Sequence, residues 1–254
     1  MRIYFMGICG TAMGNAALLM RALGHEVMGS DTGIYPPMSD HLRDAGVDIL
    51  EGWSAERLAQ LKPDLVVVGN VASRGHPEVE WLLEARTQPY VSLPELLRTR
   101  LLNERRNVVV AGTHGKTTTT SLIASILAEA GMDPTYVIGG KLEAANANAK
   151  LGTGEYIVAE ADESDASFLH LTPVMSVVTN IDQDHMETYE HSFDKLKSAF
   201  VEFLQQLPFW GMAVVCIDDV NIRQILPRVT KPVMTYGFSE AAKVRAINLK
   251  ADAG

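Results

Sequence analysis

The middle of the chain contains the stretch Val108-Val109-Val110-Ala111-Gly112-Thr113-His114-Gly115-Lys116-Thr117-Thr118. Its β-branched start predicts a buried strand, and a helix is expected from Lys116 onward. A glycine turn between them would present backbone N–H groups and a helix N-terminus to an anion, and Lys116 adds a full positive charge. Val110 stands where the usual phosphate-loop pattern has its first glycine, and an ordinary turn capped by a threonine is the alternative. We predict an ATP-binding loop, with contacts from Gly112, Thr113, Gly115, Lys116, Thr117 and Thr118.

Acidic residues and a histidine follow two further predicted strands. Glu160 and Asp162 come directly after the strand expected over 156–159, and the motif Asp182-Gln183-Asp184-His185 follows the next one. In open α/β sheets, ligands bind at the C-terminal ends of the parallel strands. Carboxylates and an imidazole beside a phosphate loop suit Mg²⁺ or Mn²⁺, and Thr117 is placed to give its hydroxyl to such an ion. A solvated acidic loop is the alternative.

A second glycine turn, Gly7-Ile8-Cys9-Gly10-Thr11-Ala12-Met13-Gly14, follows the first predicted strand and opens a helix. Its glycine spacing differs from that of the dinucleotide fingerprint, so it supports a diphosphate-bearing nucleotide, with NAD(P) as the alternative. Asp31 follows the second predicted strand. After the fourth strand, Asn70 and Arg74 are placed to meet a sugar or phosphate, unless this segment is only a polar turn. We therefore expect one domain to hold a nucleotide-linked substrate and the other to hold ATP.

Predicted strands alternate with predicted helices along the whole chain, which indicates the α/β class with parallel sheets. We expect a Rossmann-like domain over 1–106 and a P-loop-type ATP-binding α/β domain over 107–254. The tail from Lys243 begins a strand and stops, so we expect the second domain to be incomplete. The patterns also predict strands at 65–68 and 107–111, helices over 55–61, 77–85, 94–102, 116–130 and 193–207, and a loop over 146–149.

The composition excludes several classes of protein. The chain has 254 residues, 47% of them hydrophobic, and a net charge of −9, which disfavours binding to nucleic acid. It has 2 cysteines, Cys9 and Cys216, too few for a disulfide framework, and we expect Cys9 to be a packing residue rather than a nucleophile. No apolar run reaches the roughly 18 residues of a membrane span. We expect a cytoplasmic protein; nothing indicates its oligomeric state.

Three motifs together resemble the Mur ligases of bacterial cell-wall synthesis. They are Ala111–Thr120, Glu160-Ala161-Asp162-Glu163-Ser164-Asp165, and Thr179-Asn180-Ile181-Asp182 followed by Asp184-His185-Met186. In the first hundred residues, Tyr35-Pro36-Pro37-Met38-Ser39 and Gly69-Asn70 add to the resemblance. It implies an ATP-dependent ligase that joins L-alanine to UDP-N-acetylmuramate through an acyl phosphate. The alternatives are a ligase that attaches a recycled L-Ala-γ-D-Glu-meso-diaminopimelate peptide, or an inactive nucleotide-binding fragment.

The resemblance also implies roles for single residues. Lys116 would stabilise the transferring phosphate, and His114 would touch the acyl phosphate. Mg²⁺ would be held by Thr117 and Glu160, with a second ion at His185, and Asn180 would lie on the ATP side. The family has a third domain that closes over ATP, so we expect this chain alone to be inactive. Contacts to the UDP-sugar substrate would come from Gly7, Gly10, Ser30, Asp31, Asn70 and Ser164.

Overall fold

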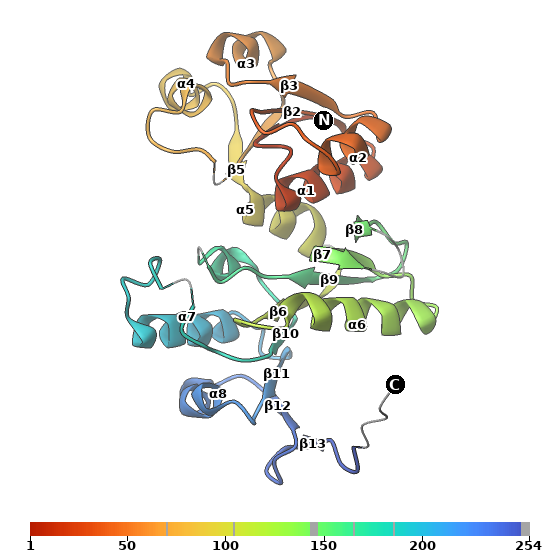
Figure 1. Cartoon of the computed structure of the whole chain (residues 1–254), viewed down its shortest axis with the longest axis vertical. Coiled ribbons are helices and arrows are strands. Elements are labelled where there is room, and N and C mark those ends of the chain that lie inside the picture. Colours follow the sequence, from red (N-terminus) through yellow and green to blue (C-terminus); the bar gives the residue numbers. More distant parts are fainter. Residues whose placement is uncertain (70, 104, 143–146, 165, 185, 250–254) are drawn as a thin grey trace. The chain divides into compact units, whose positions relative to one another are not determined.

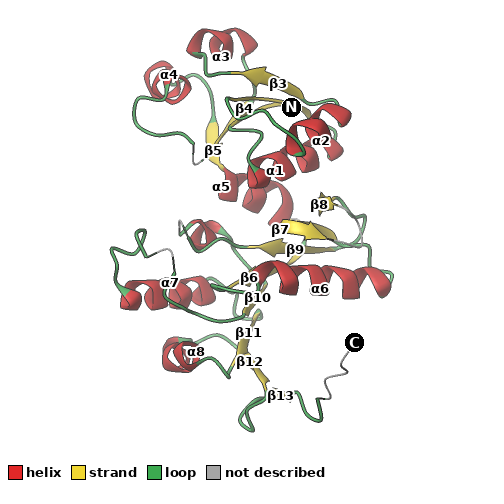
Figure 2. Cartoon of the chain, viewed as in Figure 1, coloured by secondary structure: helices red, strands yellow, loops and turns green. Residues whose placement is uncertain are grey.

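The computed structural model of the chain describes residues 1–69, 71–103, 105–142, 147–164, 166–184 and 186–249. The chain divides into two compact units. The first contains Met1–Arg100 and Thr135–Thr153, and the second contains Leu101–Pro134 and Gly154–Gly254. Both combine helices with strands, which alternate along most of the chain (Figure 1 and Figure 2). The predicted α/β class is confirmed.

The first unit is built on a parallel sheet whose strands are separated by helices. The elements are β1 (Arg2–Met6), α1 (Thr11–Ala22), β2 (Glu26–Asp31), α2 (Met38–Asp44), β3 (Asp48–Glu51), α3 (Ala55–Leu61), β4 (Leu65–Val68), α4 (Pro77–Ala85), β5 (Tyr90–Ser92) and α5 (Leu93–Leu97). The sheet has the strand order β3-β2-β1-β4-β5, and every pair is parallel. The order reverses beside β1, so the loops after β1 and β4 diverge at the edge where such sheets bind ligands.

Burial on both faces explains why β1 reads as a continuous apolar run. Its residues from Ile3 to Met6 are all 0% exposed, as expected for the central strand of a parallel sheet covered by helices. One core cluster joins the sheet to α3 and α4 through Tyr4, Met6, Met28, Leu58, Val66 and Leu82.

A buried carboxylate links the strands of the first unit to its helices. Glu78, in the first turn of α4, is 0% exposed. Its carboxylate accepts hydrogen bonds from the hydroxyls of Tyr4 (2.7 Å) and Ser30 (2.8 Å) and from the backbone N–H of Ser54 (3.1 Å). The Arg57 guanidinium lies 3.8 Å from it and supplies a counter-charge. Burial raises the pKa of Tyr4, which keeps its phenol protonated as a donor.

The second sheet carries the predicted ATP loop. Its elements and the helices around them are β6 (Arg106–Ala111), α6 (Lys116–Glu129), β7 (Thr135–Leu142), β8 (Ala147–Lys150), β9 (Tyr156–Glu160), β10 (Met175–Val178), α7 (Phe193–Gln205), β11 (Met212–Cys216), α8 (Val220–Ile225), β12 (Val233–Gly237) and β13 (Val244–Arg245). The strand order is β13-β12-β11-β10-β6-β9-β7-β8. Helix α6 runs along β6 and β9 (Figure 1).

The prediction of a loop over 146–149 was wrong. Residues 147–150 form β8, which pairs antiparallel with β7 and places Val137 opposite Ala149; Asn146 lies outside the described residues. Alanine and asparagine have low strand propensity, so the pairing with β7, and not the local sequence, determines this strand.

Two helical segments also differ from the prediction. The helix expected over 94–102 ends at Leu97 and continues as a π-helical turn over Arg98–Leu102, where the Thr99 hydroxyl donates to the Glu95 carbonyl at 2.8 Å. Helix α8 was not predicted, because its single turn and a half is too short for a periodic pattern. The Asp219 carboxylate caps it by accepting the Ile222 N–H at 2.7 Å.

Replacement of Glu78 is expected to destabilise the first unit strongly. Glu78→Ala removes the acceptor of two buried hydroxyls and one backbone N–H, so we expect a loss of about 3 kcal/mol in the free energy of unfolding. Chemical denaturation measures this loss. The control is Glu84→Ala on the exposed side of the same helix, for which we expect less than about 0.5 kcal/mol. Equal losses in the two variants would contradict the role given to Glu78.

Candidate functional site

Three neighbouring strands of the second sheet bring the predicted site together. Strand β6 lies between β10 and β9, and all three run parallel. Ala111 pairs with Val178, and Val110 pairs with Glu160. The loop that follows β6 therefore begins beside the ends of both neighbours, where the motifs after β9 and β10 also begin.

The glycines of the loop are required by its geometry. Gly112 has a φ of 136°, and a Cβ atom there would lie 2.1 Å from the Thr179 hydroxyl oxygen. Gly115 has a φ of 80° and is the N-cap residue of α6. A side chain at Gly112 would force the loop away from the end of β10, so this glycine permits the close approach of the two segments.

The loop after β10 holds the phosphate-type loop through backbone and side-chain hydrogen bonds. The Asn180 amide spans His114, because its Oδ1 accepts the His114 N–H at 2.9 Å and its Nδ2 donates to the His114 carbonyl at 2.8 Å. Thr113 is 9% exposed, and its hydroxyl accepts the Asp182 N–H at 2.9 Å. Asn180, predicted to contact ATP, thus contacts the loop backbone. The signal in the sequence for this role is only its position after a strand.

Lys116 makes an ion pair that sequence analysis missed. Its ammonium donates to both carboxylate oxygens of Glu163, at 2.9 and 2.8 Å, and to the carbonyls of Gly112 (2.8 Å) and Thr113 (3.3 Å). Burial raises the pKa of Glu163, and the Lys116 charge partly opposes that rise. Glu163 lies inside a motif that we singled out, but no local pattern indicates which of its acids faces the lysine.

Thr117 and Glu160 form an oxygen pair suited to Mg²⁺. The Thr117 hydroxyl lies 3.1 Å from each carboxylate oxygen of Glu160. In the part of the chain that the structure describes, no group of three acidic, histidine or cysteine side chains is arranged to hold a metal. Mg²⁺ commonly takes one or two protein oxygens and completes its shell with phosphates and water, so this pair fits such an ion. His185, the third predicted ligand, lies outside the described residues.

The remaining residues predicted for the second unit lie around the same loop. The His114 ring is exposed, with Nε2 3.4 Å from the Asp182 carboxylate, and Thr118 is exposed on the first turn of α6. The Ser164 N–H donates to the Asp162 carboxylate at 2.9 Å, and the Ser164 carbonyl accepts from the Thr188 hydroxyl. The His114 ring is thus solvent-exposed beside Asp182, and the Ser164 backbone is held by its neighbours.

The glycine turn of the first unit is organised by Asp31. Its carboxylate is 8% exposed and accepts the N–H groups of Cys9 and Gly33, both at 2.8 Å. Gly7 has a φ of 75°, and its N–H donates to the Ser30 carbonyl at 2.8 Å. Asp31 and Gly7 thus shape the turn that leads into α1.

The other residues around this turn differ in their exposure at the edge of the sheet. The Ser30 side chain is 0% exposed and committed to Glu78, so its hydroxyl lies in the interior and not at the edge. Gly10 is exposed and is the N-cap residue of α1. Burial raises the pKa of the Cys9 thiol, which makes it a poor nucleophile. Asn70 lies outside the described residues.

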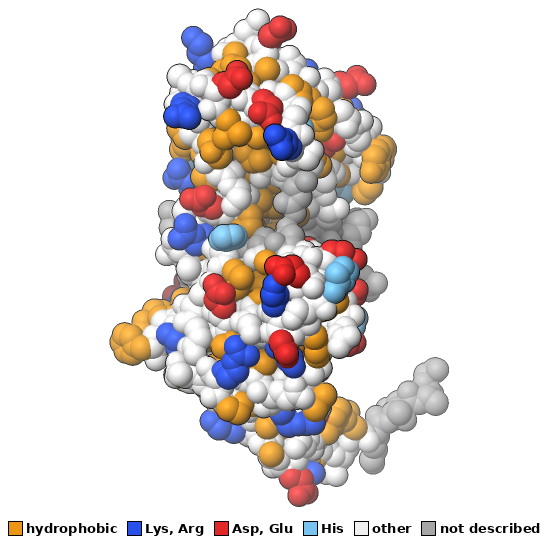
Figure 3. All heavy atoms as spheres, turned by 90° about the vertical axis from the view of Figure 1, so that its left-hand side faces the viewer, with side chains coloured by type: hydrophobic (Ala, Val, Ile, Leu, Met, Phe, Trp, Pro, Cys, Tyr) orange, Lys and Arg blue, Asp and Glu red, His pale blue; other side chains and the backbone are white. Residues whose placement is uncertain are grey.

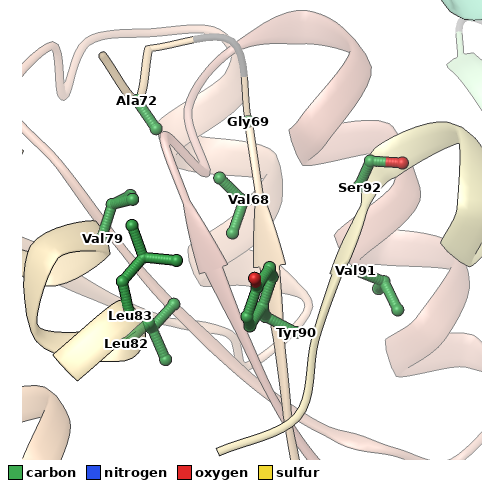
Figure 4. Close-up of a pocket in the computed structure, with 9 residues that line it drawn as sticks. All are labelled: Val68, Gly69, Ala72, Val79, Leu82, Leu83, Tyr90, Val91 and Ser92. Carbon is green, nitrogen blue, oxygen red and sulfur yellow. The ribbon is translucent and has the colours of Figure 1, made fainter. Parts of the chain in front are cut away.

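A cavity of about 460 Å³ lies beside β4, β5 and α4 of the first unit (Figure 4). Aliphatic side chains and the ring of Tyr90 line most of it, and none of the predicted site residues is among them. Because it offers few polar groups, it does not match the chemistry of a phosphate-bearing ligand. The glycine turns, and not this cavity, remain the candidate ligand sites.

Charges of both signs are mixed on one face of the chain (Figure 3). On the face drawn in Figure 3, blue and red side chains are interspersed, without a broad basic area among the described residues. Within the residues that the structure covers, no helix combines the length and apolar character needed to cross a membrane.

Comparison with known proteins gives the family. Residues 110–254 match the Mur ligase middle domain, and residues 2–105 match the Mur ligase family catalytic domain. The UDP-N-acetylmuramate–L-alanine ligase of Methylobacillus flagellatus is 56% identical over 99% of this chain, which covers 52% of that protein. The corresponding ligase of Thiobacillus denitrificans is 53% identical, again over 99% of this chain and 53% of its own length. This chain thus spans about half the length of these relatives.

Solved structures agree with these relatives. A murein peptide ligase from Psychrobacter arcticus superposes with a TM-score of 0.88 at 36% identity, over 99% of this chain and 57% of that one. A UDP-N-acetylmuramate–alanine ligase from Thermotoga maritima gives 0.78 at 29% identity, over 93% of this chain and 52% of that one. Since the family descriptions match both halves of the sequence and the folds agree, this chain belongs to the Mur ligase family.

Proposed function

We propose that the protein to which this chain belongs joins L-alanine to UDP-N-acetylmuramate at the expense of ATP. The observation that carries the proposal is the placement of Lys116, Thr117 and Glu160 at one sheet edge. The relatives at 56% and 53% identity, both named UDP-N-acetylmuramate–L-alanine ligases, support it. We assign residues 1–106 to UDP-N-acetylmuramate and residues 107–254 to ATP.

In the proposed site, the chain binds ATP through the start of α6. The first N–H groups of a helix have no partner within the helix and face an anion at its N-terminus. Lys116 would place a positive charge beside the transferring phosphate, and Thr117 with Glu160 would hold Mg²⁺. Mg²⁺, when bound there, neutralises phosphate charge. The loop after β10 holds the His114 backbone through the Asn180 amide, and we assign the His114 ring to the acyl phosphate.

In the first unit, the UDP-sugar would bind at the glycine turn after β1. Asp31 holds the Cys9 N–H and thereby shapes the turn, and the N–H groups of Gly7 and Gly10 are held by the Ser30 and Gly7 carbonyls. The first N–H groups of α1, at the exposed residues Thr11 and Ala12, would then meet the phosphate oxygens. The buried hydroxyl of Ser30 supports this turn through Glu78 and does not contact the ligand. We assign the protein to the cytoplasm, where a chain with only 2 cysteines needs no disulfide framework.

A second candidate function has its own support. The murein peptide ligase from Psychrobacter arcticus has a TM-score of 0.88 with this chain, higher than the 0.78 of the Thermotoga maritima alanine ligase. The amino partner would then be the L-Ala-γ-D-Glu-meso-diaminopimelate peptide. Phosphate release from ATP separates the two functions when it is measured with UDP-N-acetylmuramate and either L-alanine or the peptide. If phosphate is released with the peptide and not with L-alanine, the peptide-ligase function would replace our proposal.

Loss of the Lys116 charge is expected to weaken the binding of ATP but not that of UDP-N-acetylmuramate. Lys116→Ala removes charge-assisted hydrogen bonds to phosphate, so we expect the Kd for ATP to rise at least about 10-fold. The Kd for UDP-N-acetylmuramate should stay within about twofold, because its proposed site belongs to the other unit. Isothermal titration measures both constants. Lys195→Ala, which removes a half-exposed lysine of α7, is the control. If the binding of both ligands were weakened equally, the assignment of ATP and UDP-N-acetylmuramate to separate units would be refuted.

If Thr117 and Glu160 hold Mg²⁺, replacing either residue should weaken ATP binding only when Mg²⁺ is present. Thr117→Ala and Glu160→Gln should each weaken ATP binding about 10-fold in the presence of Mg²⁺, because the first removes an oxygen ligand of the ion and the second removes the negative charge of its carboxylate ligand. In EDTA the same variants should bind ATP within about twofold of the parent chain. Thr119→Ala, two residues further along α6, should change neither value. Equal losses with and without Mg²⁺ would show that the pair does not act through a metal.

A further inference from the structure

All hydrogen-bond donors of the Lys116 ammonium are engaged within the chain itself. The group has three N–H donors. Four oxygens lie within reach, namely both carboxylate oxygens of Glu163 and the carbonyls of Gly112 and Thr113, at 2.8 to 3.3 Å. The ammonium is therefore saturated before any phosphate arrives. A phosphate oxygen obtains a hydrogen bond from Lys116 only if one of these acceptors gives way.

Glu163 is held firmly in the position from which it binds the lysine. Its side chain is 3% exposed, and that of Lys116 is 16% exposed. The Glu163 carbonyl accepts from the buried hydroxyl of Tyr189 and from the Ala166 N–H at 3.1 Å. The segment that follows the Asp-His-Met motif thus fixes the Glu163 backbone, and the ion pair is not a chance contact between two flexible surface side chains.

The carboxylate and a phosphate would compete for the same ammonium. Both are anions that form strong, charge-assisted hydrogen bonds with lysine. When phosphate takes Lys116, Glu163 loses its partner while largely buried, which is costly for a carboxylate. It also repels the incoming negative charge. Each of these effects opposes nucleotide binding, and both end if the carboxylate is replaced by a neutral amide of the same shape.

We propose that Glu163 is a positioning residue that holds Lys116 in the nucleotide-free state and weakens phosphate binding until it is displaced. The inference rests on the proposed function, since it takes the loop after β6 as the ATP site. It extends that function by adding a competing internal anion. The same competition acts on every phosphate that reaches Lys116, so it also favours the release of ADP and phosphate after turnover.

The test measures ATP affinity in EDTA, where Mg²⁺ does not contribute. Glu163→Gln keeps the size of the side chain and removes its charge, so we expect the Kd for ATP to fall about 10-fold. The control is Asp162→Asn, which removes the same charge from the same loop and keeps the oxygen that accepts the Ser164 N–H. We expect it to lower the Kd by less than about twofold. A merely structural role of Glu163 predicts weaker binding instead.

A double-mutant cycle then separates competition for the lysine from general charge effects. In a Lys116→Gln background, Glu163→Gln should change the Kd no more than Asp162→Asn does. Glu163→Asp withdraws the carboxylate by one methylene and should also tighten binding, which provides a second variant should Glu163→Gln fold poorly. An unchanged or higher Kd in these Glu163 variants would overturn the inference while leaving the ATP site in place. If neither the parent chain nor any variant binds ATP or tripolyphosphate, both the proposed function and this inference fail.

Discussion

The site depends on one constraint, the parallel alignment of β9, β6 and β10. Because Ala111 pairs with Val178 and Val110 with Glu160, three loops leave the sheet at the same edge. Gly112 then passes so close to Thr179 that no side chain fits. The contacts among Asn180, His114 and Thr113 follow from this proximity. An antiparallel neighbour in place of β9 or β10 would send its loop to the opposite edge and dismantle the site.

Two acids of one short motif serve consecutive residues of α6. Glu160, at the end of β9, faces the Thr117 hydroxyl, and Glu163, three residues later, binds the Lys116 ammonium. The first arrangement brings together the oxygens to which we assign Mg²⁺, whereas the second neutralises the charge that we assign to phosphate. Nucleotide binding would therefore strengthen one arrangement and break the other. The ion pair with Glu163 leaves the partly buried Lys116 with a partner.

In the first unit, two acidic side chains support the edge to which we assign the UDP-sugar. Glu78 is fully buried and joins β1, β2 and the start of α3, while Asp31 accepts backbone N–H groups of the glycine turn. The carboxylates of these two acids accept hydrogen bonds from the chain itself and are not assigned to a ligand. Their contribution is a well-held turn at the end of β1, which leads into the N-terminus of α1, where we propose that the diphosphate binds.

The sequence by itself determined the α/β class, the bounds of α3, β4 and α4, and the phosphate-type loop with Lys116 and Thr117, because these depend on local periodicity and on glycine positions. The tertiary structure alone decided that Glu163 faces Lys116, that Glu78 is a buried acceptor and that residues 147–150 form a strand. Lys116 and Glu163 are 47 residues apart in the sequence. Contacts at such separations are set by the order in which strands join the sheet, and local residue patterns do not specify that order.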